Sequence, residues 1–124
     1  MITEDYVSFE VAKLLKDKGF NEPTIGTYNI ESKNPILVER PIRAIHCEAI
    51  ISAPTLQMAC RWLTTTHNLF ITFELDFSDG AYPMFDAVVY NLATCEKYPI
   101  INYDRYSYIK GTEAAIKYCL ENLI

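Results

Sequence analysis

The sequence contains little of what marks several large classes of protein. Only 4 of its 124 residues are glycine and 6 are proline, while 50% are hydrophobic. This balance excludes a disordered or collagen-like chain. No apolar run approaches the ~18 residues of a membrane span, and the opening MITEDYVSFE has acids where a signal peptide has bases. We therefore expect one cytoplasmic domain over residues 1–124 and no association with membranes.

Basic residues are also too few for a typical nucleic-acid-binding protein. The chain has 11 Lys and Arg against 16 Asp and Glu, which gives a formal net charge of −5. Proteins that bind nucleic acid present stripes of Lys and Arg to the phosphates. The densest basic group here, Lys13, Lys16 and Lys18, is typical of the solvated face of a helix. Nucleic acid is therefore not an expected partner.

Helical spacing of apolar residues and capping signals predict three helices. The expected caps are Ser8, Thr55, and either Ser107 or Thr112. The first two helices are expected to end at Gly19 and Asn68, and the last to run from about Tyr108 to Asn122.

Alternation of apolar and polar residues predicts strands between these helices. The clearest is Leu69 to Phe77, followed by a hairpin turn at Ser78-Asp79-Gly80 and a return strand from Met84 to Leu92. Further strands are expected near Ile100–Tyr103, Thr24–Ile30 and Arg43–Ser52, and Asn34-Pro35 and Arg40-Pro41 mark a loop or a sheet edge. The expected fold is α+β, with three helices packed on a single layer of antiparallel sheet of three to five strands, in the order α-β-(β)-α-β-β-β-α.

Three stretches together resemble a group of small uncharacterised proteins from Bacteroides-type genomes and their prophages or mobile elements. They are Val7-Ser8-Phe9-Glu10 with Leu15-Lys16 and Gly19-Phe20, then Ala53-Pro54-Thr55 with Trp62, and finally Ala114 to Leu120. The chain departs from the group at Thr64-Thr65-Thr66 and at Tyr108 to Gly111. The resemblance implies a source for the chain and no activity, because the group has no established function.

Catalytic and metal-binding motifs are missing. The sequence has no CxxC pair, no GxSxG, no HExxH and no glycine-rich phosphate loop. His46 and Cys47 are neighbours on an expected strand, so they point to opposite faces and cannot easily share a metal. Cys60 lies on an apolar helix stripe, which favours an inert thiol. We expect no catalytic residue, no metal and no cofactor, and a small enzyme that pairs Cys60 with His46 or His67 is the alternative.

Paired acids on the clearest strand are a weaker candidate for catalysis. Glu74 and Asp76 lie two residues apart on its polar face, and general acid–base chemistry requires one such carboxyl in a dry pocket. We interpret both as solvated, and Asp79 and Asp86 likewise.

The most unusual local feature is a cluster of aromatic residues. Tyr98, Tyr103, Tyr106 and Tyr108 fall within eleven residues, with Asp104 and Arg105 between them. Interfaces favour tyrosine and arginine, because these side chains bury a large area and keep a polar end. The expected partner-binding residues are Tyr98, Tyr103, Arg105, Tyr106, Tyr108 and Trp62. Tyrosines that edge the sheet, half in the core, are the alternative interpretation, and stacking on single-stranded nucleic acid is a further one.

The function expected from these observations is a non-enzymatic, protein-binding accessory or regulatory module. Its protein partner is unknown from the sequence, and a homodimer through an exposed sheet edge is one arrangement. An acidic protein that occupies the nucleic-acid-binding surface of a host factor is an alternative.

Overall fold

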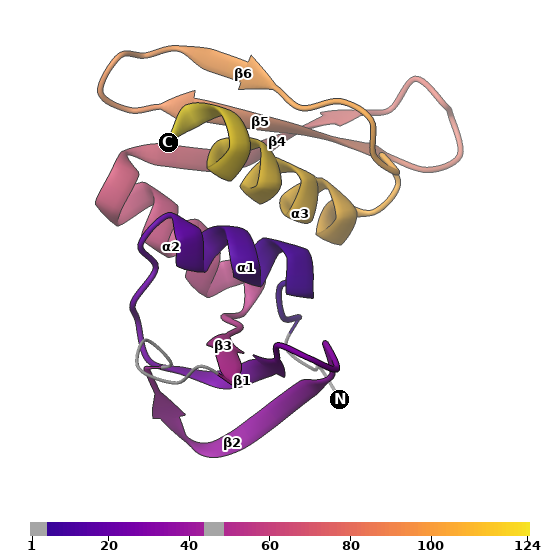
Figure 1. The fold of residues 1–124 in the computed structure, drawn as a ribbon. Helices are drawn as coiled ribbons and strands as arrows, with labels where there is room; N and C mark the ends of the chain where they lie inside the picture. The colour runs from indigo at the N-terminus through magenta and orange to yellow at the C-terminus, as the bar shows by residue number, and fades with distance from the viewer. Residues whose placement is uncertain (1–4, 44–48) are drawn as a thin grey trace. The chain divides into compact units, whose positions relative to one another are not determined.

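Residues 5–43 and 49–124 are described by a computed structural model, drawn in Figure 1. The contacts of the chain group into two compact units, Met1–Ala59 and Cys60–Ile124. The boundary falls inside one helix, and each unit contains its own sheet. The single-domain organisation expected from the length stays a prediction.

The α+β class is confirmed, and the arrangement of its strands differs from the expected one. The described residues form three helices and two three-stranded antiparallel sheets. The strands before the second helix pair among themselves, as do the strands after it, so the single sheet layer that we expected is wrong. Strand pairing joins distant segments, and periodicity alone does not specify which strands become neighbours.

The first unit begins with helix α1, Phe9–Asp17. The Ser8 hydroxyl accepts a hydrogen bond from the Val11 N–H at 3.3 Å, which caps the helix as predicted. After the helix, Gly19 takes the left-handed φ of 94°, and the Phe20 N–H reaches back to the Leu15 carbonyl at 2.9 Å. Val11, Ala12 and Leu15 make up the buried stripe of this helix.

The first sheet has the strand order β2-β1-β3, with β1 at Thr24–Asn29, β2 at Pro35–Ile42 and β3 at Ile50–Ser52. Strand β2 is an edge strand that starts at Pro35 and contains Pro41, so the proline signals mark an edge. Of the strand expected over Arg43–Ser52, Ile50–Ser52 is observed as strand, and residues 44–48 lie outside the described part. In Figure 1, α1 and β2 lie on opposite sides of β1.

The second helix, α2, covers Leu56–His67 and joins the two units. The Met58 N–H donates to the Thr55 hydroxyl at 3.1 Å, and Asn68 takes a φ of 57° directly after the helix. Both end signals read from the sequence are therefore confirmed.

The second unit contains β4 at Leu69–Asp76, β5 at Met84–Asn91 and β6 at Lys97–Pro99, hydrogen-bonded in that order. Strands β4 and β5 pair over eight consecutive residues without a bulge. Helix α3, Tyr108–Tyr118, packs on β5 and β4 and continues as a wider π-helical turn over Cys119–Leu123. Ser107, rather than Thr112, caps it by accepting from the Lys110 N–H at 3.2 Å.

The third strand of the meander starts earlier than expected, at Lys97 instead of Ile100. Residues 100–105 still run beside β5, because the Ile100 N–H donates to the Ala87 carbonyl at 2.9 Å and the Phe85 N–H donates to the Arg105 carbonyl at 2.6 Å. These contacts are too widely spaced for a regular ladder, so the segment is an attached loop. We call residues 100–107 the strap.

Side chains of β4 alternate between two faces, as the sequence predicts. Phe73 faces α3, since a Cβ at Gly111 would come within 2.8 Å of its ring. By alternation and cross-strand pairing, the helix face carries Leu69, Ile71, Phe73 and Leu75 of β4 with Phe85, Ala87 and Val89 of β5. The outer face carries Glu74 and Asp76.

None of the helices in the described part of the chain has the length and apolar character that crossing a membrane requires.

Candidate interaction surface

The tyrosines predicted from the sequence do not form one surface. Tyr103 is half-buried, and its hydroxyl donates to the Phe85 carbonyl and accepts from the Ala87 N–H, both at 2.6 Å. Both of its hydrogen bonds hold the strap against β5. Tyr103 is therefore a structural residue of this unit.

Tyr98 is also half-buried. It lies opposite Val89, and its ring packs against Tyr118 of α3 with 6.2 Å between the centroids. Its hydroxyl donates to Glu96 at 2.9 Å, and this hydrogen bond raises the pKa of the Tyr98 phenol. Tyr98 and Tyr103 therefore fit the alternative interpretation, tyrosines at the sheet edge that are half-buried in the core, better than they fit a partner-binding role.

Tyr106 and Tyr108 are different, because both are at least half exposed. The Tyr108 ring lies 6.0 Å from the ring of Phe85, which stands opposite Leu75 in the β4–β5 ladder. The Asp79 carboxylate, in the β4–β5 turn, raises the pKa of the Tyr106 phenol. Both tyrosines thus lie at the turn end of the hairpin.

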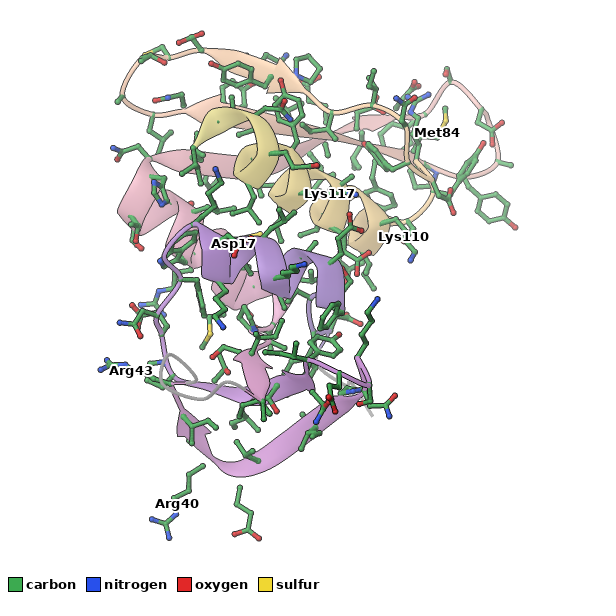
Figure 2. All side chains as sticks on the ribbon, in the orientation of Figure 1. Asp17, Arg40, Arg43, Met84, Lys110 and Lys117 are labelled. Carbon is green, nitrogen blue, oxygen red and sulfur yellow. The ribbon has the colours of Figure 1, made fainter. Side chains whose placement is uncertain are left out.

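Three further large apolar side chains are exposed at this end. Leu75, Phe77 and Tyr82 have 51%, 67% and 71% of their surface open to solvent. Figure 2 shows Met84 at the turn end of the hairpin and Lys110 in the first turn of α3, toward the same end of this unit. We call the exposed residues of this end the hairpin patch: Leu75, Phe77, Tyr82, Tyr106 and Tyr108.

Sequence reasoning missed Leu75, Phe77 and Tyr82. Phe77 continues the apolar alternation of β4, but it lies one residue beyond the strand, and Gly111 in the first turn of α3 already lies over Phe73. An apolar alternation that continues beyond the part of the strand that the helix covers is a signal that could have identified Leu75 and Phe77.

Arg105 joins the strap to the sheet through two carboxylates. Its Nε and Nη2 donate to the two oxygens of Asp86 at 2.6 and 2.9 Å, and Nη2 also donates to Asp76 at 3.0 Å. These hydrogen bonds, the one to Asp86 foremost, raise the pKa of the Arg105 guanidinium. Hydrogen bonds from Ser78, followed by that from Arg105, hold the pKa of Asp76 below its usual value.

A shallow groove of about 400 Å³ lies on the outer face of the sheet, beside this ion pair. Glu74, Asp86, Lys97 and Arg105 are among its lining residues, and Lys97 binds Glu74 at 2.8 Å. Since these charges are paired with one another, the groove offers a ligand no unpaired ion. Three of the four acids that we interpreted as solvated, Glu74, Asp76 and Asp86, are ion-paired. Neither Glu74 nor Asp86 lies in a dry pocket.

Trp62 lies apart from the hairpin patch. It is 7% exposed, and its indole packs edge-on against the His67 ring with 4.8 Å between the centroids. Its burial does not fit the partner-binding role expected for it. The His67 Nε2 is buried and has no hydrogen-bond partner among the described residues.

The cysteines do not form a reactive pair in the described residues. Burial raises the pKa of the Cys60 thiol to about 11 and that of Cys119 to about 12, which disfavours the thiolate that nucleophilic catalysis requires. Seven residues separate Cys60 from His67 along α2, a rise of about 10 Å. His46 and Cys47, the other members of the proposed pairs, lie outside the described residues. Within residues 5–43 and 49–124, no three His, Cys, Asp or Glu side chains gather as metal ligands would.

Comparison of the chain with family models, curated proteins and solved structures finds no match. The resemblance in three stretches therefore stays a prediction. The geometry of the chain itself carries the functional argument.

Proposed function

We propose that the protein is a non-enzymatic binding module that docks another protein through the hairpin patch. The observation that carries this proposal is the gathering of Leu75, Phe77, Tyr82, Tyr106 and Tyr108 at one end of the second unit, each at least half exposed. Contiguous apolar surface rimmed by polar groups is typical of protein-binding sites. Tyrosine suits such a surface because it supplies a large contact area at a small entropic cost.

One feature of the rim supports docking of a protein. Arg105, next to Tyr106 in the chain, is fixed by its hydrogen bonds to Asp76 and Asp86. Side chains that are already held lose less conformational entropy on binding. The residue beside the exposed Tyr106 is therefore already ordered before a partner binds.

The alternative functions have less support. The raised pKa of Cys60 opposes a Cys–His enzyme. An acidic protein that imitates nucleic acid needs unpaired carboxylates along one face, and on the outer face of this sheet Glu74, Asp76 and Asp86 are all paired with cations.

An accessory or regulatory role in the cytoplasm completes the proposal. The described cysteines, Cys60, Cys95 and Cys119, are all free thiols, which supports a reducing compartment. The resemblance of three stretches supports a source in Bacteroides-type genomes or their mobile elements.

Affinity capture with matched variants tests the proposal. The tagged wild-type chain, the double variant Tyr106→Ser with Tyr108→Ser, and the control Leu92→Ser are each incubated with nuclease-treated host lysate. Leu92 is exposed to the same degree as the patch residues but lies in the turn after β5.

We expect the wild type and Leu92→Ser to retain the same protein, and the double variant to recover at least tenfold less of it. Equal recovery by the double variant would contradict the proposal. So would recovery of the bait alone from a chain that is also monomeric in solution.

A further inference from the structure

Strand β4 is paired along one edge only. All eight of its residues pair with β5, and no strand of the described residues lies along its other edge. The Leu92 N–H donates to the Asn68 carbonyl, so in this register the even-numbered residues of β4 direct their backbone N–H and C=O groups toward β5. By that alternation, the backbone groups of Leu69, Ile71, Phe73 and Leu75 point outward.

Within residues 5–43 and 49–124, only the first of these outward positions has a partner. The Leu69 carbonyl accepts a hydrogen bond from the Thr64 hydroxyl at 2.9 Å, at the end of α2. The open stretch of the edge is therefore residues 71–75, and its midpoint is Phe73. An extended segment placed there would find a row of donors and acceptors already aligned.

Strand β2, one of the two edge strands of the other sheet, is protected in ways that β4 is not. Strand β2 contains Pro35 and Pro41, which lack N–H donors, and its ladder with β1 shifts register between Thr24 and Gly26. Proteins use such prolines and irregularities to prevent edge pairing. Strand β4, LFITFELD, contains no proline and no lysine, and its ladder has no bulge.

We propose that β4 pairs antiparallel with β4 of a second copy, centred on Phe73, so that two three-stranded sheets become one sheet of six strands. The proposal rests on the proposed function, because it names a second copy as a protein partner and buries Leu75 and Phe77 of the hairpin patch. On the helix face, Phe73 would oppose its own counterpart, and Ile71 would oppose Leu75. All of these cross-strand contacts are apolar.

The outer face is compatible with the same register. Thr72 would oppose Glu74, and Phe70 would oppose Asp76, so no acid faces an acid. A register centred on Glu74 would place two Glu74 carboxylates together, and like charges directly opposite each other are destabilising. Glu74 and Asp76 are also neutralised within their own chain by Lys97 at 2.8 Å and Arg105 at 3.0 Å. Two copies can therefore approach despite the net charge of −5.

Sedimentation equilibrium on the full chain is the first test. We expect a concentration-dependent mass that reaches twice the 14.2 kDa of one chain. Leu75→Lys places a charge on the open edge, and Leu75→Pro removes an outward donor, so both should raise the dimer dissociation constant at least tenfold. Leu92→Lys, an equally exposed site off the edge, should leave it unchanged. Circular dichroism checks that each variant is folded.

Disulfide crosslinking tests the register and does not depend on those variants. Thr72→Cys and Glu74→Cys are made separately in a chain that also carries Cys47→Ser and Cys95→Ser. In the proposed register, Thr72 and Glu74 of different copies form a close pair without hydrogen bonds, with Cα atoms about 4.5 Å apart. That distance suits a disulfide.

A mixture of the two variants should crosslink one Thr72→Cys chain to one Glu74→Cys chain, and neither variant should crosslink to itself. Self-crosslinking of either variant would indicate a different register and would overturn the proposal. A dimer that survives Leu75→Lys and Leu75→Pro in folded protein would overturn it as well. A monomeric wild type that still captures a host protein through Tyr106 and Tyr108 would overturn this inference and leave the proposed function standing.

Discussion

The Tyr103 hydroxyl donates to the Phe85 carbonyl and accepts from the Ala87 N–H, so one side chain satisfies two backbone groups of β5 that β6 does not reach. The strap therefore takes the place of a longer third strand. It also carries Arg105 to its carboxylates, with the exposed Tyr106 directly after it. The position of the exposed tyrosines depends on this buried one.

Replacing Tyr103 with phenylalanine should destabilise the protein by about 1–3 kcal/mol, because two part-buried backbone groups lose their partner. Urea unfolding followed by circular dichroism measures the change. Tyr98→Phe is the control. Among the described residues its hydroxyl bonds only the exposed Glu96 carboxylate, so its effect should be much smaller. Equal losses from the two variants would show that the strap does not depend on the Tyr103 bonds.

Gly111→Ala should also destabilise the protein, although alanine favours helix over glycine by about 1 kcal/mol. A Cβ at this position would lie 2.8 Å from the Phe73 ring and 3.1 Å from that of Tyr103, and such overpacking costs about 1–3 kcal/mol. Thermal unfolding should show a lower Tm. Lys110→Ala, one residue earlier and exposed, should leave the Tm nearly unchanged. A higher Tm for Gly111→Ala would mean that the rings give way easily.

The Asp76 carboxylate should contribute to stability in a defined pH range. Its pKa is lowered in the fold by Ser78 first and by Arg105 after it. A group whose folded pKa lies below its unfolded value stabilises the protein above its ordinary pKa of about 3.9 and loses that effect as the pH falls through the folded value.

Arg105→Gln should raise the pKa of Asp76 in the folded protein toward its ordinary value without reaching it, because the Ser78 hydrogen bonds remain. Carbon-detected NMR titration of the carboxyl groups measures the shift. The variant should also lose the salt dependence of stability that this exposed ion pair confers. An unchanged Asp76 titration would show that Arg105 does not act on it.

Alkylation should separate the cysteines by their burial. In a Cys47→Ser chain, iodoacetamide should modify Cys95, which is exposed, and leave Cys60 and Cys119 unmodified until the protein unfolds. Burial raises the thiol pKa of Cys60 to about 11 and that of Cys119 to about 12, so few thiolates form near neutral pH. Peptide mass spectrometry of a time course measures the rates. Modification of Cys60 as fast as Cys95 would revive the Cys–His alternative.

Features encoded within a few residues could be predicted from the sequence. The Ser8 and Thr55 caps, the left-handed Gly19 and Asn68, and the β4–β5 hairpin depend on neighbours in the chain, and the structure confirms them. The division into two sheets could not be predicted, because it depends on which distant strands pair. The observed start of β6 differs from the predicted one for a related reason. Beyond Pro99, hydrogen bonds between the strap and Ala87 and Phe85 replace a regular ladder.

The candidate site was predicted only in part. Nearness in sequence suggested one tyrosine surface, but Tyr98 and Tyr103 turn toward the helix and the sheet, and Tyr106 and Tyr108 turn toward solvent. In an irregular loop, tertiary hydrogen bonds decide whether each side chain points to the core or to solvent, and composition does not reveal those bonds. Leu75 and Phe77 join the patch for a reason of length, because β4 and the residue that follows it extend past the helix that covers the strand.

Gly111 has a consequence for the order in which the second unit assembles. Its missing side chain is what lets α3 lie against Phe73 of β4 and Tyr103 of the strap at once. Because the contact is this close, α3 gains little packing energy until the Phe73 and Tyr103 rings have both reached their folded positions. During refolding, the amide protons of α3 should therefore gain protection from solvent exchange after those of the hairpin, which makes the C-terminal helix a reporter of the completed unit.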